Sequence, residues 1–458
     1  MPGMSSPPGW VGPWMTRQRW YANKGTLPAL EEIGSWSLGS AEPGVRIVTH
    51  LLLDHTIGKP ALYQVPFTYR DRPLPDSSAL VAEAGGQHVY DAPHDQAYTA
   101  ALLEFMSGEH EARGDRTWAL GRAALSSRPA RPASSAFTSR VLTGEQSNTS
   151  IVFEADGMPE PVICKLFRTL HDGDNPDVEL QTALAAAGSD AVPHSLGHVV
   201  ADWRDTGEPT GRAHGHLAFA QEFLVGSNDG WRVALDAAAA GVTFSAEARA
   251  LGIATAGVHA TLAATLPTSG TTQVDIDATV DHMHGRLAAA ITEVPEVERF
   301  APAIREVFGL ASLVEWPAQQ RIHGDLHLGQ VLAAPGRGWV LVDFEGEPLR
   351  PMRERSRLDS PLRDVAGMLR SFDYVAGSLS VGRPTADLAD WTTAARAAFT
   401  DGYAEASGCD IRANRALLDA FELDKALYEI VYEARNRPTW LPIPVAAIER
   451  LSLRVART

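Results

Sequence analysis

The sequence predicts an α+β protein in which a β-rich first half is followed by a mostly helical second half. Up to about residue 223, short segments with alternating apolar residues are separated by turn residues, a pattern typical of strands. After residue 228, Ala-rich segments repeat their apolar residues with helical spacing. The chain has 458 residues, and because domains commonly contain roughly 150 residues, we expect about three folded parts.

Before residue 136, the pattern predicts a small antiparallel sheet, one helix and a linker. Strands are expected at 45–52 and 60–69, and a turn follows at 71–76. The helix is expected at 94–108. Residues 126–135 read SSRPARPASS, and this Ser, Pro and Arg composition indicates a linker.

Between residues 136 and 223, the sequence predicts a second sheet that carries one helix. The helix is expected at 176–187, because Asn175 can cap its start and Pro176 suits its first position. The expected strands cover residues 136–142, 150–154, 161–168 and 216–223.

The second half predicts a series of helices interrupted by one β-type insert. The insert covers 320–332 and 338–344, where short apolar runs flank polar residues. The helices are expected at 234–266, 276–292, 298–313, 361–377, 384–407 and 413–436. A strand-rich lobe followed by a helical lobe is therefore the expected layout.

The charge balance restricts the kind of partner. Lys and Arg number 40, Asp and Glu number 56, and the formal net charge is −16. Proteins that follow a nucleic-acid backbone or bind an anionic membrane normally have a basic surplus. Neither nucleic acid nor membrane is therefore expected as a partner.

Cysteine content and the N-terminal sequence predict the compartment. Cys164 and Cys409 are too few for a disulfide framework or a four-thiolate metal site. The first ten residues lack the charged start and apolar run of a signal peptide. No apolar stretch approaches the roughly 18 residues that cross a bilayer. We expect a cytoplasmic protein.

Two acidic motifs in the second half have the composition of a phosphoryl-transfer site. Residues 320–332 read QRIHGDLHLGQVL, and residues 339–348 read WVLVDFEGEP. Phosphoryl transfer needs one carboxylate that orients the acceptor hydroxyl and accepts its proton, and a second that binds Mg²⁺ together with a neutral oxygen ligand. Asp325 fits the first role, and Asp343 with Gln330 fits the second.

A lysine and a glutamate in the first half fit the remaining task, which is to position the phosphates of ATP. Lys165 lies within the predicted strand VICKLF, and Glu179 lies in the helix that follows. Kinases place an amide five residues after the catalytic aspartate, and the interval from Asp325 to Gln330 is the same. The lysine, the glutamate and the two aspartates also follow the kinase order. Together these features predict a kinase that uses ATP and Mg²⁺, with a bilobal protein-kinase-like fold.

Two other classes of protein use parts of this pattern. His323 and His327 flank Asp325, and an H-x-D-x-H sequence suits zinc in a metal-dependent hydrolase. The lysine and the glutamate would then have no role, so we expect His323 to brace the loop, whereas the role of His327 stays open. A nucleotide-binding protein without turnover would not need to keep all of these residues. Asp364 is expected to brace the catalytic loop, because buried carboxylates need partners.

Two further segments lie where a kinase binds ATP. The turn at 143–149 precedes the strand of the lysine, and it contains a single glycine. Its backbone N–H groups and the hydroxyls of Ser147, Thr149 and Ser150 are expected to donate to phosphate oxygens, although an ordinary polar hairpin is the alternative. Gln221 and Phe223 are expected on the strand that links the lobes, at the adenine edge.

Segments from near the start to near the end of the chain carry a resemblance to a known family. They are RWYANKG (19–25), GEQSNTS (144–150), NPDVEL (175–180), HGDLHLGQVL (323–332), VLVDFEGEP (340–348), SPLRDVAGMLRSFDY (360–374) and NRPTWLPIP (436–444). These segments resemble the actinobacterial maltokinases, which belong to the aminoglycoside-phosphotransferase-like superfamily. Other members of that superfamily share only the shorter His-Gly-Asp and Asp-Phe cores. The resemblance covers almost the whole chain, and residues 126–135 match least well.

The resemblance implies a specific reaction and a specific partner. The reaction is ATP-dependent phosphorylation of maltose at its anomeric hydroxyl, which yields maltose 1-phosphate and ADP and feeds α-glucan (glycogen) synthesis from trehalose. Trehalose synthase is the implied partner. A kinase of another sugar, an aminosugar or an amino alcohol is the alternative on the same fold.

The resemblance also implies an arrangement of the chain and roles for its residues. The implied fold has an N-terminal cap subdomain, expected at 1–95, a nucleotide lobe at 96–223 and a helical lobe at 224–458. By motif, Asp325 is the implied catalytic base. The Mg²⁺ ligands and the phosphate-positioning pair are those given above.

The acceptor sugar is expected at a helix near the C-terminus. Several charged and aromatic residues of this segment fall near one helix face, and sugars are often held by aromatic faces with hydrogen-bonding charged groups. The alternative is a helix that packs its tyrosines into the core and exposes its charges. The candidate wall of the disaccharide site consists of Lys425, Tyr428, Tyr432, Arg435 and Trp440.

Overall fold

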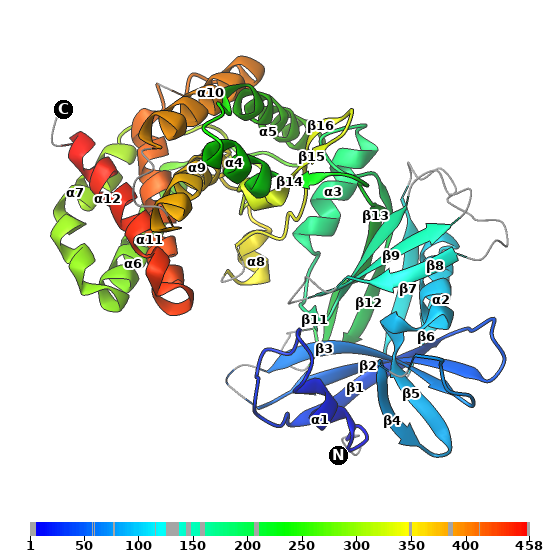
Figure 1. The fold of residues 1–458 in the computed structure, drawn as a ribbon. Helices are drawn as coiled ribbons and strands as arrows, with labels where there is room; N and C mark the ends of the chain where they lie inside the picture. The colour runs from blue at the N-terminus through cyan, green and yellow to red at the C-terminus, as the bar shows by residue number, and fades with distance from the viewer. Residues whose placement is uncertain are drawn as a thin grey trace. The chain divides into compact units, whose positions relative to one another are not determined.

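The computed structural model contains two compact units (Figure 1). Unit 1 comprises Met1–Ala186 and Pro193–Val225, and unit 2 comprises Ala187–Val192 and Gly226–Thr458. Unit 1 is rich in strands and unit 2 in helices, so the predicted α+β class is confirmed. The residues described are 6–56, 58, 60–76, 78–114, 116–124, 137–142, 148–155, 161–205, 210–347, 350–382, 388–411 and 413–455, and the expected linker at 126–135 lies outside them.

The first sheet of unit 1 has the strand order β1-β2-β3-β5-β4, with β11 paired to β3. The expected strands at 45–52 and 60–69 are β2 and β3, which pair over their whole length. Aromatic residues at the start of the chain, Trp14, Trp20 and Tyr21, pack on this sheet and form its core with Tyr63 and Phe67. The elements are α1 (Val11–Met15), β1 (Leu30–Leu38), β2 (Val45–Asp54), β3 (Ala61–Arg70), β4 (Leu80–Ala84), β5 (Gln87–Asp91) and η1 (Ala92–His94).

The second sheet of unit 1 has the strand order β6-β7-β12-β13-β10-β9-β8. The helix expected at 176–187 is α3, and Asn175 Oδ1 accepts a hydrogen bond of 2.9 Å from the N–H of Asp177, so the predicted cap is confirmed. The strand β12 was not expected. The elements are α2 (Gln96–Ser107), β6 (Glu111–Arg113), β7 (Trp118–Ala123), β8 (Phe137–Val141), β9 (Asn148–Ala155), β10 (Val162–Phe167), β11 (Thr169–Leu170), α3 (Pro176–Ala186), β12 (Ser195–Arg204) and β13 (Arg212–Glu222).

A buried arginine ties the two sheets of unit 1 together. Arg168 follows β10 and has no exposed surface. Its guanidinium donates to Thr149 Oγ1 on β9 at 2.8 Å and to both carboxylate oxygens of Asp91 at 2.9 and 3.0 Å. It also lies 4.8 Å from the ring centre of Trp20. Because Asp91 and Trp20 belong to the first sheet and its aromatic core, Arg168 fixes the start of β9 to that part of the chain.

Replacing Arg168 by Met is expected to lower the free energy of unfolding by about 3 kcal/mol, because Asp91 is left as a buried charge without its partner. Urea denaturation followed by circular dichroism measures this change. The control is Arg46→Met, which removes an exposed arginine 3.9 Å from the Tyr69 ring and should cost about 1 kcal/mol or less. Equal losses for the two variants would contradict the prediction.

Unit 2 consists of helices around a small sheet of strand order β14-β15-β16. The helical segment expected at 234–266 is divided between α4 and α5: α4 ends and Gly241 follows with φ +67°, a left-handed conformation that stops a helix. The segment at 320–332, expected as a loop between short apolar flanks, is loop that leads into β15, and the part of the insert expected at 338–344 contains β16. The elements are β14 (Asn228–Asp229), α4 (Gly230–Ala239), α5 (Ser245–Thr265), α6 (Gln273–Glu293), η2 (Pro295–Phe300), α7 (Ala301–Ala311), η3 (Leu328–Gln330), β15 (Val331–Ala334), β16 (Gly338–Leu341), α8 (Met352–Arg355), α9 (Leu362–Gly382), α10 (Ala389–Ser407), α11 (Arg415–Asn436), η4 (Pro438–Trp440) and α12 (Pro442–Val455).

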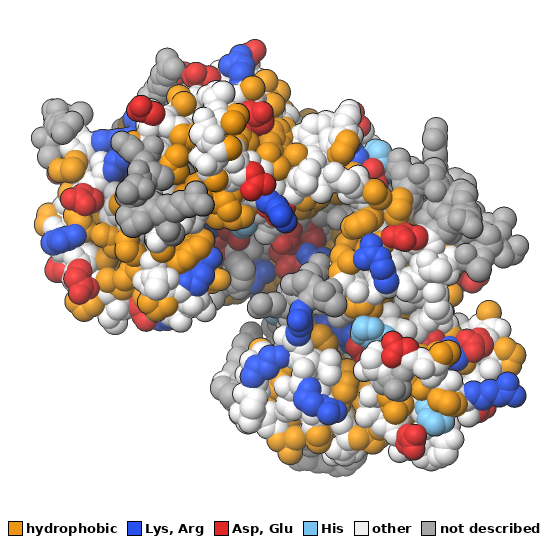
Figure 2. All heavy atoms as spheres, viewed as in Figure 1, with side chains coloured by type: hydrophobic (Ala, Val, Ile, Leu, Met, Phe, Trp, Pro, Cys, Tyr) orange, Lys and Arg blue, Asp and Glu red, His pale blue; other side chains and the backbone are white. Residues whose placement is uncertain are grey.

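One face of the surface carries charged side chains of both signs. On the face drawn in Figure 2, Lys and Arg side chains are scattered among acidic and hydrophobic ones. None of the helices in the described part of the chain has an apolar stretch sufficient to cross a membrane.

Candidate active site

The loop that carries Asp325 is held in place by a buried carboxylate of α9. Asp364 is 1% exposed; its Oδ2 accepts the N–H of His323 at 2.8 Å, and its Oδ1 accepts the N–H of Gly324 at 2.9 Å. His259 Nε2 lies 3.0 Å from the same Oδ2. Burial opposes ionisation of Asp364, but the hydrogen bond from His259 and the neighbouring groups outweigh it and lower its pKa. The predicted bracing role of Asp364 is confirmed.

His323 is a second brace of the same loop. Its Nε2 lies 3.0 Å from the carbonyl oxygen of Val342, and its Nδ1 accepts the N–H of Asp325 at 3.4 Å. Nε2 must therefore carry the proton. Its ring centre also lies 4.5 Å from that of Phe344. Both ring nitrogens have protein partners, which confirms the bracing role and argues against a zinc site that uses His323.

The hairpin of β15 and β16 brings the two expected metal ligands together. Gln330 immediately precedes β15, and Asp343 follows β16 by two residues. Gln330 Nε2 donates to Asp343 Oδ2 at 3.0 Å. Asp343 has φ +66°, a conformation that costs a non-glycine residue free energy and is concentrated at functional sites. Both side chains offer oxygen atoms, which Mg²⁺ prefers, so the residues fit this ion; their role as ligands stays a prediction.

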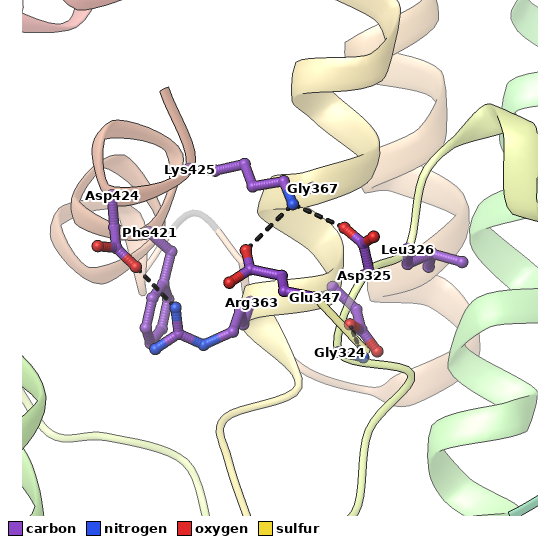
Figure 3. A pocket seen from close by; sticks show the side chains of 10 residues that line it. Gly324, Asp325, Leu326, Glu347, Arg363, Gly367, Phe421, Asp424 and Lys425 are labelled. Atoms are coloured by element: carbon purple, nitrogen blue, oxygen red, sulfur yellow. Dashed lines mark hydrogen bonds and ion pairs between the residues drawn. The ribbon is translucent and has the colours of Figure 1, made fainter. Parts of the chain in front are cut away.

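Asp325 forms an ion pair with a lysine that lies 100 residues later in the chain (Figure 3). Lys425 Nζ, from α11, donates to Asp325 Oδ1 at 2.7 Å and to Glu347 Oε1 at 3.1 Å. Burial alone would lower the pKa of Lys425, but the carboxylates of Asp325 and Glu347 outweigh it and raise that pKa above its ordinary value. Lys425 is therefore a permanently charged group beside the expected base.

Glu347 has cations around both of its oxygens. Its Oε2 accepts from Arg286 Nη2 at 2.8 Å and from Arg350 Nε at 3.0 Å, while its Oε1 accepts from Lys425. Burial would raise the pKa of Glu347, but Lys425, Arg286 and Arg350 hold it well below its ordinary range. Glu347 is therefore an ionised carboxylate that lines the cavity beside Asp325 and Lys425.

The same network continues to two further carboxylates. Asp424 lies 3.4 Å from Arg286 Nε and accepts from Arg363 Nη1 at 2.8 Å. Arg363 Nε also donates to Asp359 at 2.7 Å. In this network, the carboxylates of Asp325, Glu347, Asp359 and Asp424 are ion-paired with the cations of Lys425, Arg286, Arg350 and Arg363. The cavity beneath Asp325 and Lys425 has a volume of about 10 Å³, room for about one water molecule.

Unit 1 carries the expected phosphate-positioning lysine. Lys165 lies on β10, and its Nζ lies 3.2 Å from Oδ2 of Asp177, in the first turn of α3. Asp177 is in turn held by Gln181, which donates to its Oδ1 at 2.6 Å. The predicted pairing of Lys165 with Glu179, two residues further along this helix, stays a prediction.

The other expected nucleotide residues also lie in unit 1. Ser147 lies outside the described residues. Thr149 and Ser150 are buried at the start of β9, and the Thr149 hydroxyl accepts from Arg168. Gln221 lies near the end of β13, and the N–H of Phe223 donates to the carbonyl of Pro161 at 2.8 Å. Their contacts with ATP stay predictions.

The residues of the expected acceptor wall have different surroundings. Tyr428 lies beside the charge network, 4.8 Å from Lys425 Nζ and 5.3 Å from the Arg286 guanidinium, and stacks on Tyr432 at 6.5 Å. Arg435 forms an exposed ion pair of 2.6 Å with Glu293. Trp440 lies 6.2 Å from Tyr374 and 6.5 Å from Trp231, ring centre to ring centre. The sugar contacts of these residues stay predictions.

Sequence reasoning missed Glu347 and its arginine partners. Glu347 lies within the motif VLVDFEGEP, so the motif contained it, but no spacing rule assigned it a partner. Arg286 comes from α6, in a part of the chain that had attracted no motif. Only the packing of α6, α9 and α11 around the loop brings these charges together.

Two family models and two relatives match parts of this chain. The family model of the maltokinase N-terminal cap domain matches residues 14–95, and that of the phosphotransferase enzyme family matches residues 139–418. A glucosamine kinase from Mycolicibacterium smegmatis is 29% identical over 340 residues, which cover 68% of this chain and 79% of that protein. One from Streptacidiphilus jiangxiensis is 32% identical over 247 residues, and the match spans 50% of this chain and 56% of that protein.

The fold is shared with solved structures. A glucosamine kinase in complex with glucosamine, ADP and inorganic phosphate superposes with a TM-score of 0.61 at 22% identity, covering 90% of this chain and 95% of that one. Another crystal form gives 0.62 at 21% identity over 98% and 99% of the two chains. The predicted kinase-like fold is thereby confirmed. With the larger family match covering more than half of its residues, the chain belongs to the phosphotransferase enzyme family.

Proposed function

We propose that this protein is an ATP-dependent sugar kinase that phosphorylates maltose at its anomeric hydroxyl, giving maltose 1-phosphate and ADP. The observation that favours a neutral acceptor is that the carboxylates of the network around Asp325 already have cationic partners. Asp325, Glu347, Asp359 and Asp424 are each paired with a lysine or an arginine. An acceptor with an ammonium group would need a carboxylate of its own, whereas sugar hydroxyls can hydrogen-bond to paired groups.

In the proposed reaction, Asp325 accepts the proton of the acceptor hydroxyl as that oxygen bonds to the γ-phosphorus of ATP. The bond from the γ-phosphorus to the bridging oxygen breaks, and ADP leaves with that oxygen. Asp343 and Gln330 would hold Mg²⁺, which neutralises charge on the phosphates. Lys165, which pairs with Asp177, would bind phosphate oxygens of ATP.

Two observations from the comparisons favour different acceptors. The match of residues 14–95 to the maltokinase cap domain supports maltose. The glucosamine kinase relatives support an aminosugar as the second candidate. In the first case, maltose 1-phosphate would feed α-glucan synthesis, with trehalose synthase as the partner that supplies maltose, in the cytoplasm where ATP is available.

The test is a coupled assay of ADP release over a panel of maltose, glucose, glucosamine and ethanolamine. We expect maltose to give a kcat/KM at least about tenfold above that of the other acceptors. A site built to bind a group of its substrate discriminates by this factor or more against an analogue that lacks the group. The matched control is ADP release without acceptor. A higher kcat/KM for glucosamine than for maltose would overturn the proposed acceptor and leave the kinase reaction standing.

A further inference from the structure

Lys425 was expected to contact the sugar, but its ammonium is already engaged by two carboxylates. It donates to Asp325 Oδ1 and Glu347 Oε1, and Figure 3 shows it between them. The side chains of Lys425 and Asp325 are each 17% exposed. A lysine that only lined the sugar site would face the acceptor with its donors, so the geometry indicates another task.

Glu347 gives the lysine a fixed position. Only 3% of its side chain is exposed, and its second oxygen is held by Arg286 and Arg350 at 2.8 and 3.0 Å. A lysine side chain normally samples many rotamers, and fixing it costs up to about 2 kcal/mol of conformational entropy. The hydrogen bond to the buried Glu347 carboxylate offsets that cost. Without Lys425, Glu347 Oε1 would lose its partner in the network, and a buried acceptor without a partner costs free energy.

A catalytic base at Asp325 would need its carboxylate held in a fixed orientation. A proton acceptor must lie within hydrogen-bond reach of the hydroxyl, and small displacements reduce the rate strongly. Asp325 lies on a loop whose backbone is braced by Asp364, but that brace does not set the rotation of the Asp325 carboxylate. The ion pair to Oδ1 does.

We infer that Lys425 is a positioning residue of the phosphoryl transfer: Glu347 fixes Lys425, and Lys425 holds Asp325 by Oδ1 so that Oδ2 is presented to the acceptor hydroxyl. This inference rests on the proposed kinase function. It assigns Lys425 to the base and not to the recognition of the sugar. Glu347 acts only through Lys425.

The test compares kcat and KM of Lys425→Met, Lys425→Arg, Glu347→Gln and the double variant Lys425→Met/Glu347→Gln. We expect Lys425→Met to lower kcat about 100-fold with KM for the sugar changed less than about threefold. Lys425→Arg keeps the charge and should recover about tenfold of the loss. Glu347→Gln should lower kcat about tenfold, and the double variant should be no slower than Lys425→Met, because residues that act through one another are not additive.

The control is Arg415→Met, which removes another ion-paired cation of α11, bonded to Asp419 at 2.9 Å; it should keep wild-type kcat. Circular dichroism and ATP affinity show whether each variant is folded. A rise in KM with kcat unchanged in Lys425→Met would overturn the inference in favour of sugar binding. Multiplying effects in the double variant would overturn the role of Glu347.

Slow ATP hydrolysis without sugar separates the inference from the proposed function. Water then takes the place of the acceptor hydroxyl, so the same loss in Lys425→Met is expected. If the wild type phosphorylates no sugar in the panel, the proposed function fails, and the hydrolysis rates alone decide the role of Lys425. Hydrolysis by Lys425→Met at the wild-type rate would overturn that role.

Discussion

Replacing Asp325 by Asn is expected to lower kcat about 1,000-fold while the affinity for ATP changes less than about twofold. Asn keeps the shape of the side chain, and its Oδ1 can still accept from Lys425, but it cannot take the proton of the acceptor hydroxyl. General bases contribute about 100- to 10,000-fold to such rates. The residue is 17% exposed, so the site remains open to the acceptor.

Steady-state ADP release gives kcat, and isothermal titration gives the affinity for ATP. The control is Asp419→Asn, which removes a carboxylate of α11 that pairs with Arg415 and Arg454 away from the loop. It should keep kcat near the wild-type value. An Asp325→Asn enzyme with unchanged kcat would refute the role of Asp325 as the base.

Replacing Asp364 by Asn should lower the free energy of unfolding by about 3–5 kcal/mol and also reduce kcat. Asp364 is 1% exposed and accepts the N–H groups of His323 and Gly324. Asn offers one acceptor oxygen, so one buried N–H would face an amide N–H₂ and His259 would lose its charged partner. Gly324 has the left-handed backbone conformation φ +82°, and the two hydrogen bonds to Asp364 hold the loop in this conformation. Urea denaturation and ADP release measure the two losses.

The pH dependence of this stabilisation has a definite sign. Folding lowers the pKa of Asp364 from 3.8, because the hydrogen bond from His259 and the neighbouring groups outweigh burial. Its contribution is therefore present above that value and is lost as the pH falls through the folded pKa. The difference in unfolding free energy between the wild type and Asp364→Asn should be constant above about pH 5 and shrink below about pH 3.8. A difference that grows with acid would contradict the assignment.

Much of the kinase motif could be predicted because it is local. Asp325 and Gln330 lie on one loop, which leads into β15, and Asp343 follows β16, the strand that pairs with β15. Asn175 caps the helix that follows the strand of Lys165. Hydrogen bonds between residues a few positions apart follow from spacing alone. The confirmed strands β2 and β3 likewise follow from the alternation of apolar residues.

Other features could not be predicted, because spacing does not determine them. The separation of α4 from α5 depends on one glycine in an otherwise helical composition. The strand β12 contains Gly, His and Asp residues that hide its alternation. Asp177, which lies 3.2 Å from Lys165 Nζ, could not be singled out from the sequence, because the turn of α3 that faces the strand depends on how the helix packs.

By itself, the sequence determined the α+β class, the loop of Asp325 with its brace Asp364, and the loops and strands that carry the remaining motif residues. Only the tertiary structure decided the partners of the charges: Lys425 with Asp325 and Glu347, and Arg168 with Asp91. The physical reason is sequence distance. Ion pairs between residues 77 to 100 positions apart exist only after helices and sheets pack, and packing selects which of many acidic and basic residues lose water together.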